Sequence, residues 1–536
     1  MKIVVSFKVL PNPDRVLEED WEAFSPSNDL AYAGLEFSCF DSSALELGLR
    51  IKEQAAVQGA EATCTALTVC ESVPANLLSS LYAIGFDEVL CLPQPQREFR
   101  PAQIAALLAE EIRRQKADLV LTGTQAGMAE TGMVPYLLAQ ELGWPLASGA
   151  EDAQLQNGLL AAQCRREEGL VEQVLCLPAV CSVDNSPIVL RCATLRARMA
   201  AMSRSVTLLD AEKTLEDIPA PQLARPRGGR SCEMLDPEDK NLLPHLLALL
   251  QAEESAQSEE QAEIPSEWSE LLQERAVMVH PKSAHGADAP ALEELLADGR
   301  KELVLLPDDL SGRTLAAHLA QGKDWNCFFH AQVQELDPKQ VTVKKRVFGA
   351  NLEWTVPLAL PAVLTLDAAE QKRFAAAPVV QLEENLPLPT WLKEERLLLA
   401  AEPSALQTAN VVVACGGGMG SKDACERARE LAQLLGAGFG LTRPSALNAW
   451  GKTTEIVGQS GSSIAPRCCL VLGAAGAAAF QVGIDKADRI IAVNTDPHAL
   501  IFKNADFGLQ MDAKTLVERL IEVIQSKEEM SGNSQM

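Results

Sequence analysis

The chain begins with short apolar runs that alternate with amphipathic stretches. Runs of strand length lie at 2–9, 62–69, 88–93 and 118–124. After the first run, "DSSALELGLRIKEQAA" places small and aliphatic residues three and four positions apart, as one face of a helix requires. Ser43 and Glu46 have the spacing of a capping box, which predicts a helix beginning at Ser43. Strands alternating with helices predict a parallel sheet covered on both faces.

The same alternation returns twice after a break in composition. Residues 210–268 combine a Pro/Gly/Arg-rich linker, the amphipathic piece "NLLPHLLALLQ" and an acidic run that we expect to be mobile. A second α/β unit has strands at 275–281, 301–309 and 361–366. A Pro-rich passage, "ENLPLPTWLKEE", then leads to a last unit with strands at 410–415, 467–473 and 489–496 and a closing helix near 513–526. We expect this last unit to pivot as a rigid body on "ENLPLPTWLKEERL", residues 384–397.

The composition of the chain limits the class of protein, the kinds of partner and the cellular compartment that we expect. A chain of 536 residues is too long for one core, and its net charge of −26 disfavours nucleic acid and anionic lipid as partners. The 14 cysteines show no metal-binding spacing, and several lie in apolar runs, as buried thiols in a reducing compartment would. No apolar run reaches the roughly 18 residues of a membrane span, and "MKIVVSFKV" reads as a strand rather than a leader. We therefore expect a cytoplasmic protein with no metal site and no membrane insertion.

The last unit carries the densest chemical signal. "VVVACGGGMGSKDACERARELAQLLGAG" predicts a strand, a glycine turn and a helix, an arrangement whose backbone amides approach a phosphate at the helix N-terminus. Ser421 stands where a full G-x-G-x-x-G motif has glycine, so a plain tight turn is an equal alternative. Arg443 follows the next predicted strand, at the end where α/β proteins bind ligands. The alternative is that Arg443 is a solvated charge on the surface.

Two further stretches in this unit expose backbone and small polar groups. "GQSGSSIAP" offers Gln459, Ser460 and Ser462 as donors, and "LGAAGAAAF" predicts a second strand-to-helix turn made of small residues. "AVNTDPHALIFKNADFG" adds Asn494, Asp496 and Asp506 after a third strand. Three such loops in one unit predict a large phosphate-bearing cofactor along the edge of the sheet.

In order, the motifs "CGGGMGSK", "LTRPS", "EIVGQSG", "GAAGA", "VNTDP" and "NADFG" resemble the FAD domain of the electron-transfer flavoprotein alpha subunit. "KKRVFGANLEW" resembles a strand of the domain that precedes it in that family. The resemblance implies FAD, with Arg443 over the isoalloxazine, Ser460 at its N5 and Gln459, Ser462, Asn494 and Asp506 on the ribityl, phosphates and adenosine. The full predicted cofactor-binding set is Thr442, Arg443, Gly458, Gln459, Ser460, Gly461, Ser462, Gly473, Gly476, Ala477, Asn494, Asp496 and Asp506.

Several positions depart from the family's alpha pattern. Gly417 replaces an arginine and Ala475 a serine, and Phe480 stands where the family has a histidine that donates to the flavin's pyrimidine carbonyl. Losing that donor would make the first reduction about 60–130 mV harder than in a relative that keeps the histidine. The alternative is that Phe480 only packs in the core.

The N-terminal part resembles the family's beta subunit. The matching segments are "FSCFDSSALELGLRIKE", "ADLVLTGTQAGMAETGMVPYLLAQELGWP" and "ATLRARMAA". The resemblance implies a site for AMP, or for a second FAD in electron-bifurcating members. Ser38 and Cys39, Glu130 and Met133 replace family residues there, and we leave its occupancy open. Leu195 occupies the position of a leucine that anchors partner enzymes, and a core leucine is an equal alternative.

The resemblance covers nearly the whole chain and implies beta and alpha subunits fused in one polypeptide. The expected fold class is α/β, with two related Rossmann-like or adenine-nucleotide-hydrolase-like parallel-sheet units and a doubly wound FAD-binding domain. We expect a beta-like domain at 1–208, a linker and arm at 209–270, an alpha N-terminal-like domain at 271–395 and the FAD domain at 396–536.

The expected function is that of a flavin-dependent electron carrier, rather than a stand-alone enzyme. It would accept electrons from an acyl-CoA-type or other dehydrogenase and pass them singly to an acceptor oxidoreductase. The alternatives are an electron-bifurcating member, an adenine-nucleotide-handling enzyme of the same architecture, and a scaffold without flavin. An enzyme is less favoured because the six histidines form no recognisable triad, so no catalytic residue is expected.

Overall fold

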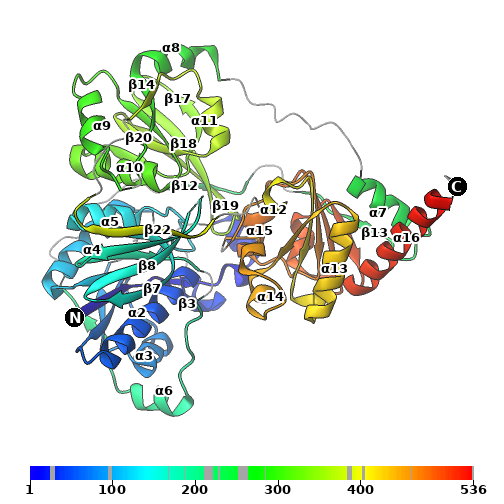
Figure 1. Cartoon of the computed structure of the whole chain (residues 1–536), viewed down its shortest axis with the longest axis horizontal. Helices are drawn as coiled ribbons and strands as arrows, with labels where there is room; N and C mark the ends of the chain where they lie inside the picture. Colours follow the sequence, from blue (N-terminus) through cyan, green and yellow to red (C-terminus); the bar gives the residue numbers. More distant parts are fainter. Residues whose placement is uncertain are drawn as a thin grey trace. The chain divides into compact units, whose positions relative to one another are not determined.

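The computed structural model divides the chain into two compact units (Figure 1). It describes residues 1–533 except 25–29, 95–98, 167, 186–187, 211–220, 227–229, 252–263, 284, 383–388, 401–404 and 460. The first unit comprises Met1–Arg225, Glu260–Phe348 and Leu352–Ala401. The second comprises Pro226–Glu259, Gly349–Asn351 and Glu402–Met536.

The first unit contains a ten-stranded mixed sheet in the order β11-β5-β4-β1-β6-β10-β7-β8-β9-β22. Its strands from β11 to β7 run parallel, and β7, β8, β9 and β22 are successively antiparallel. The bounds are β1 Lys2–Ser6, β4 Thr63–Val69, β5 Glu88–Leu92, β6 Leu119–Gly123, β7 Leu146–Gln156, β8 Leu159–Arg166, β9 Gly169–Cys176, β10 Ala179–Val183, β11 Thr207–Leu208 and β22 Leu392–Ala400. The short strands β2 Val9–Pro11 and β3 Leu35–Phe37 pair separately.

Helices bury apolar stripes against both faces of this sheet. The clusters follow the alternation of the strands: Ile3 and Val5 pack with α2, whereas Val4 and Val120 pack with α4 and α5. The helices are α1 Glu18–Glu22, α2 Cys39–Val57, α3 Ala75–Ile84, α4 Pro101–Gln115, α5 Val134–Leu142 and α6 Leu195–Ala201.

A second, all-parallel sheet lies in the same unit, in the order β16-β20-β15-β14-β21. These strands are β14 Ala276–His280, β15 Leu303–Pro307, β16 Asn326–Phe328, β20 Ala362–Leu366 and β21 Val379–Gln381, with α8 Ser266–Arg275, α9 Ala289–Leu295, α10 Leu310–Lys323 and α11 Ala368–Arg373. An antiparallel sheet joins β12 Gln222–Ala224, β19 Leu352–Ala359, β18 Gln340–Val347 and β17 Gln332–Leu336.

The second unit is a doubly wound parallel sheet in the order β13-β27-β26-β25-β23-β24. Its strands are β13 Glu233–Leu235, β23 Val411–Cys415, β24 Gly438–Leu441, β25 Cys468–Leu472, β26 Arg489–Asn494 and β27 Phe507–Gln510. Its helices are α7 Leu242–Gln251, α12 Ala405–Thr408, α13 Lys422–Leu434, α14 Arg443–Leu447, α15 Ala478–Ile484 and α16 Ala513–Asn533. The strand order reverses between β23 and β25, where ligands of open α/β sheets bind. The predicted α/β fold class is confirmed.

Two sequence-based expectations are wrong in detail. Ser43 and Glu46 form no capping box, because α2 begins at Cys39 and both residues lie inside it. The Ser43 hydroxyl donates to the carbonyl of Ile188, and Glu46 is paired with Arg50 and Arg191. Residues 392–397 of the predicted pivot form no hinge, since Leu392–Ala400 is β22, hydrogen-bonded to β9. Residues 384–388 of that passage lie outside the described ranges.

The arm predicted at 209–270 contains two elements of the second unit, β13 and α7. Leu242, Leu246, Leu247 and Leu250 of α7 are buried in the core cluster that contains α13 and α16. Cys64, Cys70 and Cys415 are buried, as expected, and Cys176 is half-buried. Over the described ranges, no helix has the length and apolar composition needed to cross a lipid bilayer.

Candidate functional site

The loops after β23 and β25 touch backbone to backbone at the carboxyl edge of the second unit's sheet. The amide of Gly418 donates to the carbonyl of Gly473 at 2.8 Å. A Cβ atom on Gly416 would lie 2.4 Å from the Cα of Ala474, and one on Gly418 2.8 Å from the carbonyl oxygen of Gly473. Only glycine permits this approach, so the glycine run of the first loop is needed for packing against the second.

The loop after β26 is joined to the loop after β25. The side-chain amide of Asn494 donates to the carbonyl of Ala474 at 2.8 Å, and its oxygen accepts from the amide of Asp496 at 3.0 Å. Gly476 has φ +88°, and a Cβ there would lie 2.1 Å from the amide nitrogen of Ile501. We expected the small residue at 476 to let a cofactor approach, but the close neighbour in the structure is the protein's own backbone.

A tight loop at 456–462 lies between the end of β24 and the start of α15. The amide of Val457 donates to Leu441 at 2.9 Å, that of Gln459 to Ala479 at 2.7 Å, and that of Ser462 to Ile456 at 2.8 Å. The side-chain nitrogen Nε2 of Gln459 is buried and has no hydrogen-bond partner among the described residues. A buried donor without an acceptor is costly, so this nitrogen fits a ligand that supplies one.

Thr442 and Arg443 begin α14 directly after β24. The amide of Thr442 donates to Cys415 at 2.9 Å, and its hydroxyl lies 3.0 Å from that of Ser445. Arg443 is the first residue of α14 and is half-buried. A fixed cation is thus held at the same edge as the glycine loops.

Most of the predicted cofactor-binding residues are brought together at this edge: Thr442, Arg443, Gly458, Gln459, Gly461, Ser462, Gly473, Gly476, Ala477, Asn494 and Asp496. Asp506 is not among them. It precedes β27 at the opposite edge, where its carboxylate accepts from the amide of Ile490 and pairs with Arg230. Ser460 lies outside the described residues.

Sequence reasoning missed residues that hold this edge together. The guanidinium of Arg429 in α13 forms a bidentate ion pair with the carboxylate of Glu455, the residue directly before the 456–462 loop. The side-chain amide of Gln481 donates to the carbonyl of Gly476 at 2.5 Å. The Arg429–Glu455 pair has no sequence signature, because its partners lie in separate elements, α13 and the 3-10 helix Thr453–Glu455. Gln481 lies in α15, only five residues after Gly476, but at a spacing that matches no capping motif.

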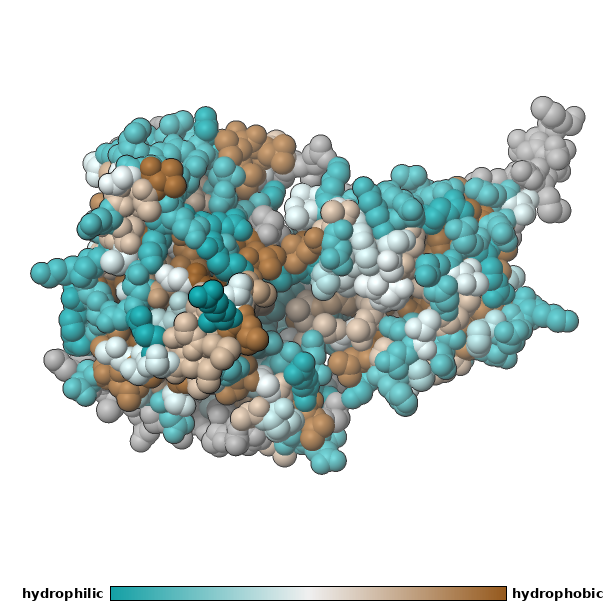
Figure 2. Space-filling model, turned by 90° about the horizontal axis from the view of Figure 1, so that it is seen from below, coloured by the Kyte–Doolittle hydropathy of each residue, from teal (hydrophilic) through white to brown (hydrophobic). Residues whose placement is uncertain are grey.

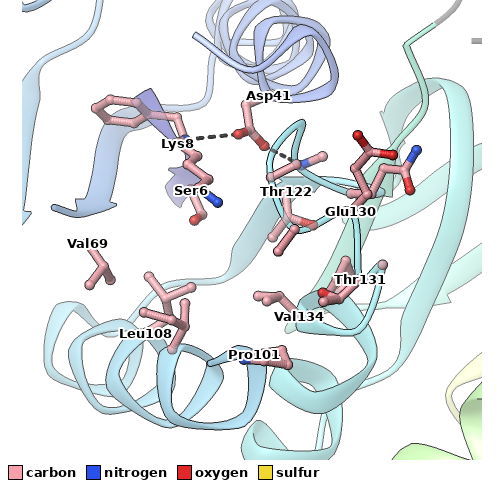
Figure 3. Close-up of a pocket in the computed structure, with 18 of the residues that line it drawn as sticks. Ser6, Lys8, Asp41, Val69, Pro101, Leu108, Thr122, Glu130, Thr131 and Val134 are labelled. Atoms are coloured by element: carbon pink, nitrogen blue, oxygen red, sulfur yellow. Dashed lines mark hydrogen bonds between the residues drawn. The ribbon is translucent and has the colours of Figure 1, made fainter. Parts of the chain in front are cut away.

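A second candidate site is a pocket at the carboxyl edge of the ten-stranded sheet (Figure 3). Asp41 accepts from the amides of Lys8 at 2.9 Å and Gly123 at 3.0 Å, which fixes the ends of β1 and β6. Thr122 lines the pocket, and its buried hydroxyl has no hydrogen-bond partner among the described residues. Thr131 and Val134 line the pocket beside the start of α5, whose amides suit an anion.

The substituted positions differ in their relation to this pocket. Glu130 lines the pocket, whereas Met133 packs in the hydrophobic core and is absent from the lining. The substitution at Met133 therefore leaves the lining of this pocket unchanged. Ser38 is buried, and Cys39 begins α2.

Doubly wound topology and converging glycine loops define a nucleotide-cofactor-binding α/β protein. The family model described as "Electron transfer flavoprotein FAD-binding domain" matches residues 405–485, and that described as "Electron transfer flavoprotein domain" matches residues 31–214. The chain belongs to the electron transfer flavoprotein family.

Individual relatives match a part of the chain. "Putative electron transfer flavoprotein subunit YgcQ" of Escherichia coli (strain K12) is 32% identical over 230 residues, which are 41% of this chain and 77% of that protein. "Protein FixB" of Bradyrhizobium diazoefficiens is 31% identical over 248 residues, 43% of this chain and 65% of that protein. "Protein FixB" of Rhizobium meliloti is 28% identical over 264 residues, 45% of this chain and 73% of that protein.

Proposed function

We propose that the protein is a flavin-dependent electron carrier that binds one FAD at the loop edge of its second unit. The observation that carries the proposal is the convergence of four loops on one sheet edge, one of which holds the Gln459 nitrogen that has no partner in the described part of the chain. The match of residues 405–485 to the FAD-binding domain of the family supports the identity of the cofactor.

The chain's residues would bind the cofactor and set its electrostatics. FAD supplies the redox chemistry, accepting two electrons and releasing them one at a time. Arg443 would place a fixed positive charge at the isoalloxazine, which favours a negatively charged reduced ring. Gln459, Ser460 and Ser462 would donate hydrogen bonds. Asn494 already uses both ends of its side-chain amide within the protein, so its part would be to hold the loops.

We propose that the chain fuses beta-like and alpha-like parts. Along the sequence, the family matches at 31–214 and 405–485 come before and after the strands β14 to β21 of a second α/β sheet, which supports this order. The proposed domains are 1–208, 271–395 and 396–536, with 209–270 as the connection. Since β13 and α7 of that connection pack in the second unit, the functional FAD domain would include them.

The pocket of Figure 3 is the proposed second nucleotide site, for AMP or a second FAD. Two features support a ligand there: the buried Thr122 hydroxyl, which has no partner within the described ranges, and the pocket's position at the start of α5. A second FAD would make the protein an electron-bifurcating member. AMP would leave it a one-flavin carrier.

The proposed partner surface is α6, which exposes an apolar stripe. Leu195, Met199 and Met202 are 75%, 64% and 75% exposed at helical spacing, and the exposed Arg196 and Arg198 flank them. Figure 2 shows weakly apolar residues beside strongly hydrophilic ones on the face that carries this helix. The exposure of Leu195 favours the anchoring role over the core alternative. A donor dehydrogenase would present an apolar pocket bordered by carboxylates.

The test is the flavin content of the purified chain. We expect one FAD per chain, with an absorbance band at about 450 nm as for bound flavins. Two FAD molecules per chain would support electron bifurcation. The loaded protein should be reduced by a dehydrogenase with its substrate and reoxidised by an acceptor oxidoreductase. A folded protein that binds AMP but no flavin would instead support the adenine-nucleotide alternative.

A further inference from the structure

Arg429 and Glu455 form a closely fitted ion pair in the second unit. The Nη1 atom of Arg429 lies 2.6 Å from Oε1 of Glu455, and Nη2 lies 3.0 Å from Oε2. The side chains are only 24% and 17% exposed. The guanidinium also lies 4.1 Å from the ring centroid of Phe439 in β24, and Nε donates to Glu426 at 3.2 Å. These contacts fix the fork of the arginine in one orientation.

The pair joins two parts of the candidate site that are distant in sequence. Arg429 belongs to α13, the helix that follows the glycine loop after β23. Glu455 ends the 3-10 helix Thr453–Glu455, directly before the 456–462 loop. Its Oε2 also accepts from the amide of Lys452 at 2.9 Å. A Cβ on Gly451 would lie 2.6 Å from the same oxygen, so the segment is packed tightly around the carboxylate.

The position of this carboxylate determines how the next loop begins. The segment between Arg443 and Glu455 leaves the sheet at the end of β24 and returns at Val457, whose amide donates to Leu441. Among the described residues, Glu455 is the last one before Gln459 whose side chain forms an ion pair, and Ile456 and Val457 after it are held by burial in the apolar clusters on the two faces of the sheet. Arg443 and Gln459, the two groups proposed to contact the flavin, stand at opposite ends of this closed segment.

We propose that Arg429 and Glu455 are positioning residues that set the spacing between Arg443 and Gln459 for flavin binding. Neither residue belongs to the predicted cofactor-binding set. The inference rests on the proposed function, because it concerns the placement of groups that would contact FAD. Burial acts to raise the pKa of Glu455, but hydrogen bonds from Arg429 and the amide of Lys452 outweigh it and lower that pKa. The carboxylate is thus charged at neutral pH.

The experiment compares three variants of the full chain. Glu455→Gln keeps the shape but removes the charge, and Arg429→Lys keeps the charge but removes the fork. Arg427→Met is the matched control, because Arg427 lies on the same helix and pairs with Glu518 of α16, away from the loop. For each, FAD affinity is measured by fluorescence titration, the flavin midpoint potential by redox titration, and the melting temperature on the apoprotein.

We expect Glu455→Gln and Arg429→Lys to bind FAD about tenfold more weakly or worse, as loss of one charge-assisted hydrogen bond would give. Their midpoint potentials should shift, while the control stays within about twofold of the wild-type affinity. The reversed pair, Arg429→Glu with Glu455→Arg, should recover part of the affinity.

The outcomes separate this inference from the proposed function. A wild-type protein that binds no FAD contradicts the proposed function itself. A wild type that binds FAD, beside variants with unchanged affinity and potential, overturns the positioning role. Variants whose apoprotein melting temperature falls while the potential of the bound flavin stays unchanged would overturn it too, since the pair would then be structural only.

Discussion

The side-chain amide of Asn494 donates a hydrogen bond of 2.8 Å to the carbonyl oxygen of Ala474, and so ties the ends of two neighbouring strands. The same side chain accepts from the amide of Asp496 at 3.0 Å. This one residue thereby orders two of the loops that form the candidate cofactor site.

We predict that Asn494→Ala lowers the free energy of unfolding of the second unit by about 1–3 kcal/mol, because two backbone groups lose their partner. FAD affinity should fall with it. Thermal unfolding of the apoprotein and a fluorescence titration with FAD measure the two effects. Asp496→Ala is the control for the unfolding measurement alone, since Asp496 belongs to the predicted cofactor-binding set: it is exposed and its carboxylate accepts from the amide of His498, so a smaller loss of stability is expected.

Gly476→Ala should destabilise the second unit by about 3 kcal/mol or more, since its φ is +88° and the new Cβ would lie 2.1 Å from the amide nitrogen of Ile501. Gly417→Ala is the matched control in the neighbouring glycine loop. A Cβ there meets nothing within 4 Å. Equal melting temperatures for the two variants would contradict this account of the glycines.

Phe480 is 5% exposed and packs in the apolar cluster that includes Val457 and Ile464. We predict that Phe480→His destabilises the apoprotein, because an imidazole replaces a ring in that cluster. The electronic prediction is separate: the first reduction of bound flavin should become easier by about 60–130 mV. A redox titration beside the wild type decides it, and an unchanged potential would leave Phe480 a packing residue.

The first unit should lose stability as the pH falls from about 4.5 to about 2. Burial acts to raise the pKa of Glu395 in β22, but His285 at 3.0 Å and Arg166 at 3.2 Å outweigh it and lower that pKa to about 2. A carboxyl group whose folded pKa lies below its ordinary 4.5 stabilises the fold above pH 4.5, and this contribution disappears as the group is protonated.

Hydrogen exchange of Leu392–Ala400 across this pH range measures the effect. Glu395→Gln should exchange faster than wild type at pH 6 and show a weaker dependence on pH between 4.5 and 2. Parallel pH curves for the two proteins would contradict the prediction.

Local patterns were sufficient to predict three adjacent strands of the second unit's six-stranded sheet, but not β13 and β27. The runs at 410–415, 467–473 and 489–496 became β23, β25 and β26, because a strand buried on both faces must be apolar throughout. The loops that follow such strands share one edge, so most of the candidate site also followed from sequence.

What the sequence did not reveal depends on contacts between distant segments. Asp506 resembles a loop donor in sequence, but it precedes a strand rather than follows one, and it therefore lies at the opposite edge with Arg230. Ser43 has the spacing of a helix cap, yet α2 begins four residues earlier, at Cys39, and the Ser43 hydroxyl donates to the distant carbonyl of Ile188. The Arg429–Glu455 pair left no periodic signal at all.

The leucines of α7 have a consequence for how the protein is made. Leu242, Leu246, Leu247 and Leu250 find their cover partly in α16, which begins at Ala513, whereas α7 ends at Gln251. About 260 residues must leave the ribosome between them. At about 5–20 residues per second, this takes roughly 13–50 s. During that time the apolar face of α7 lacks its α16 partners in the nascent chain. The need for chaperones during synthesis should therefore depend on the length of this interval rather than on the stability of the finished protein.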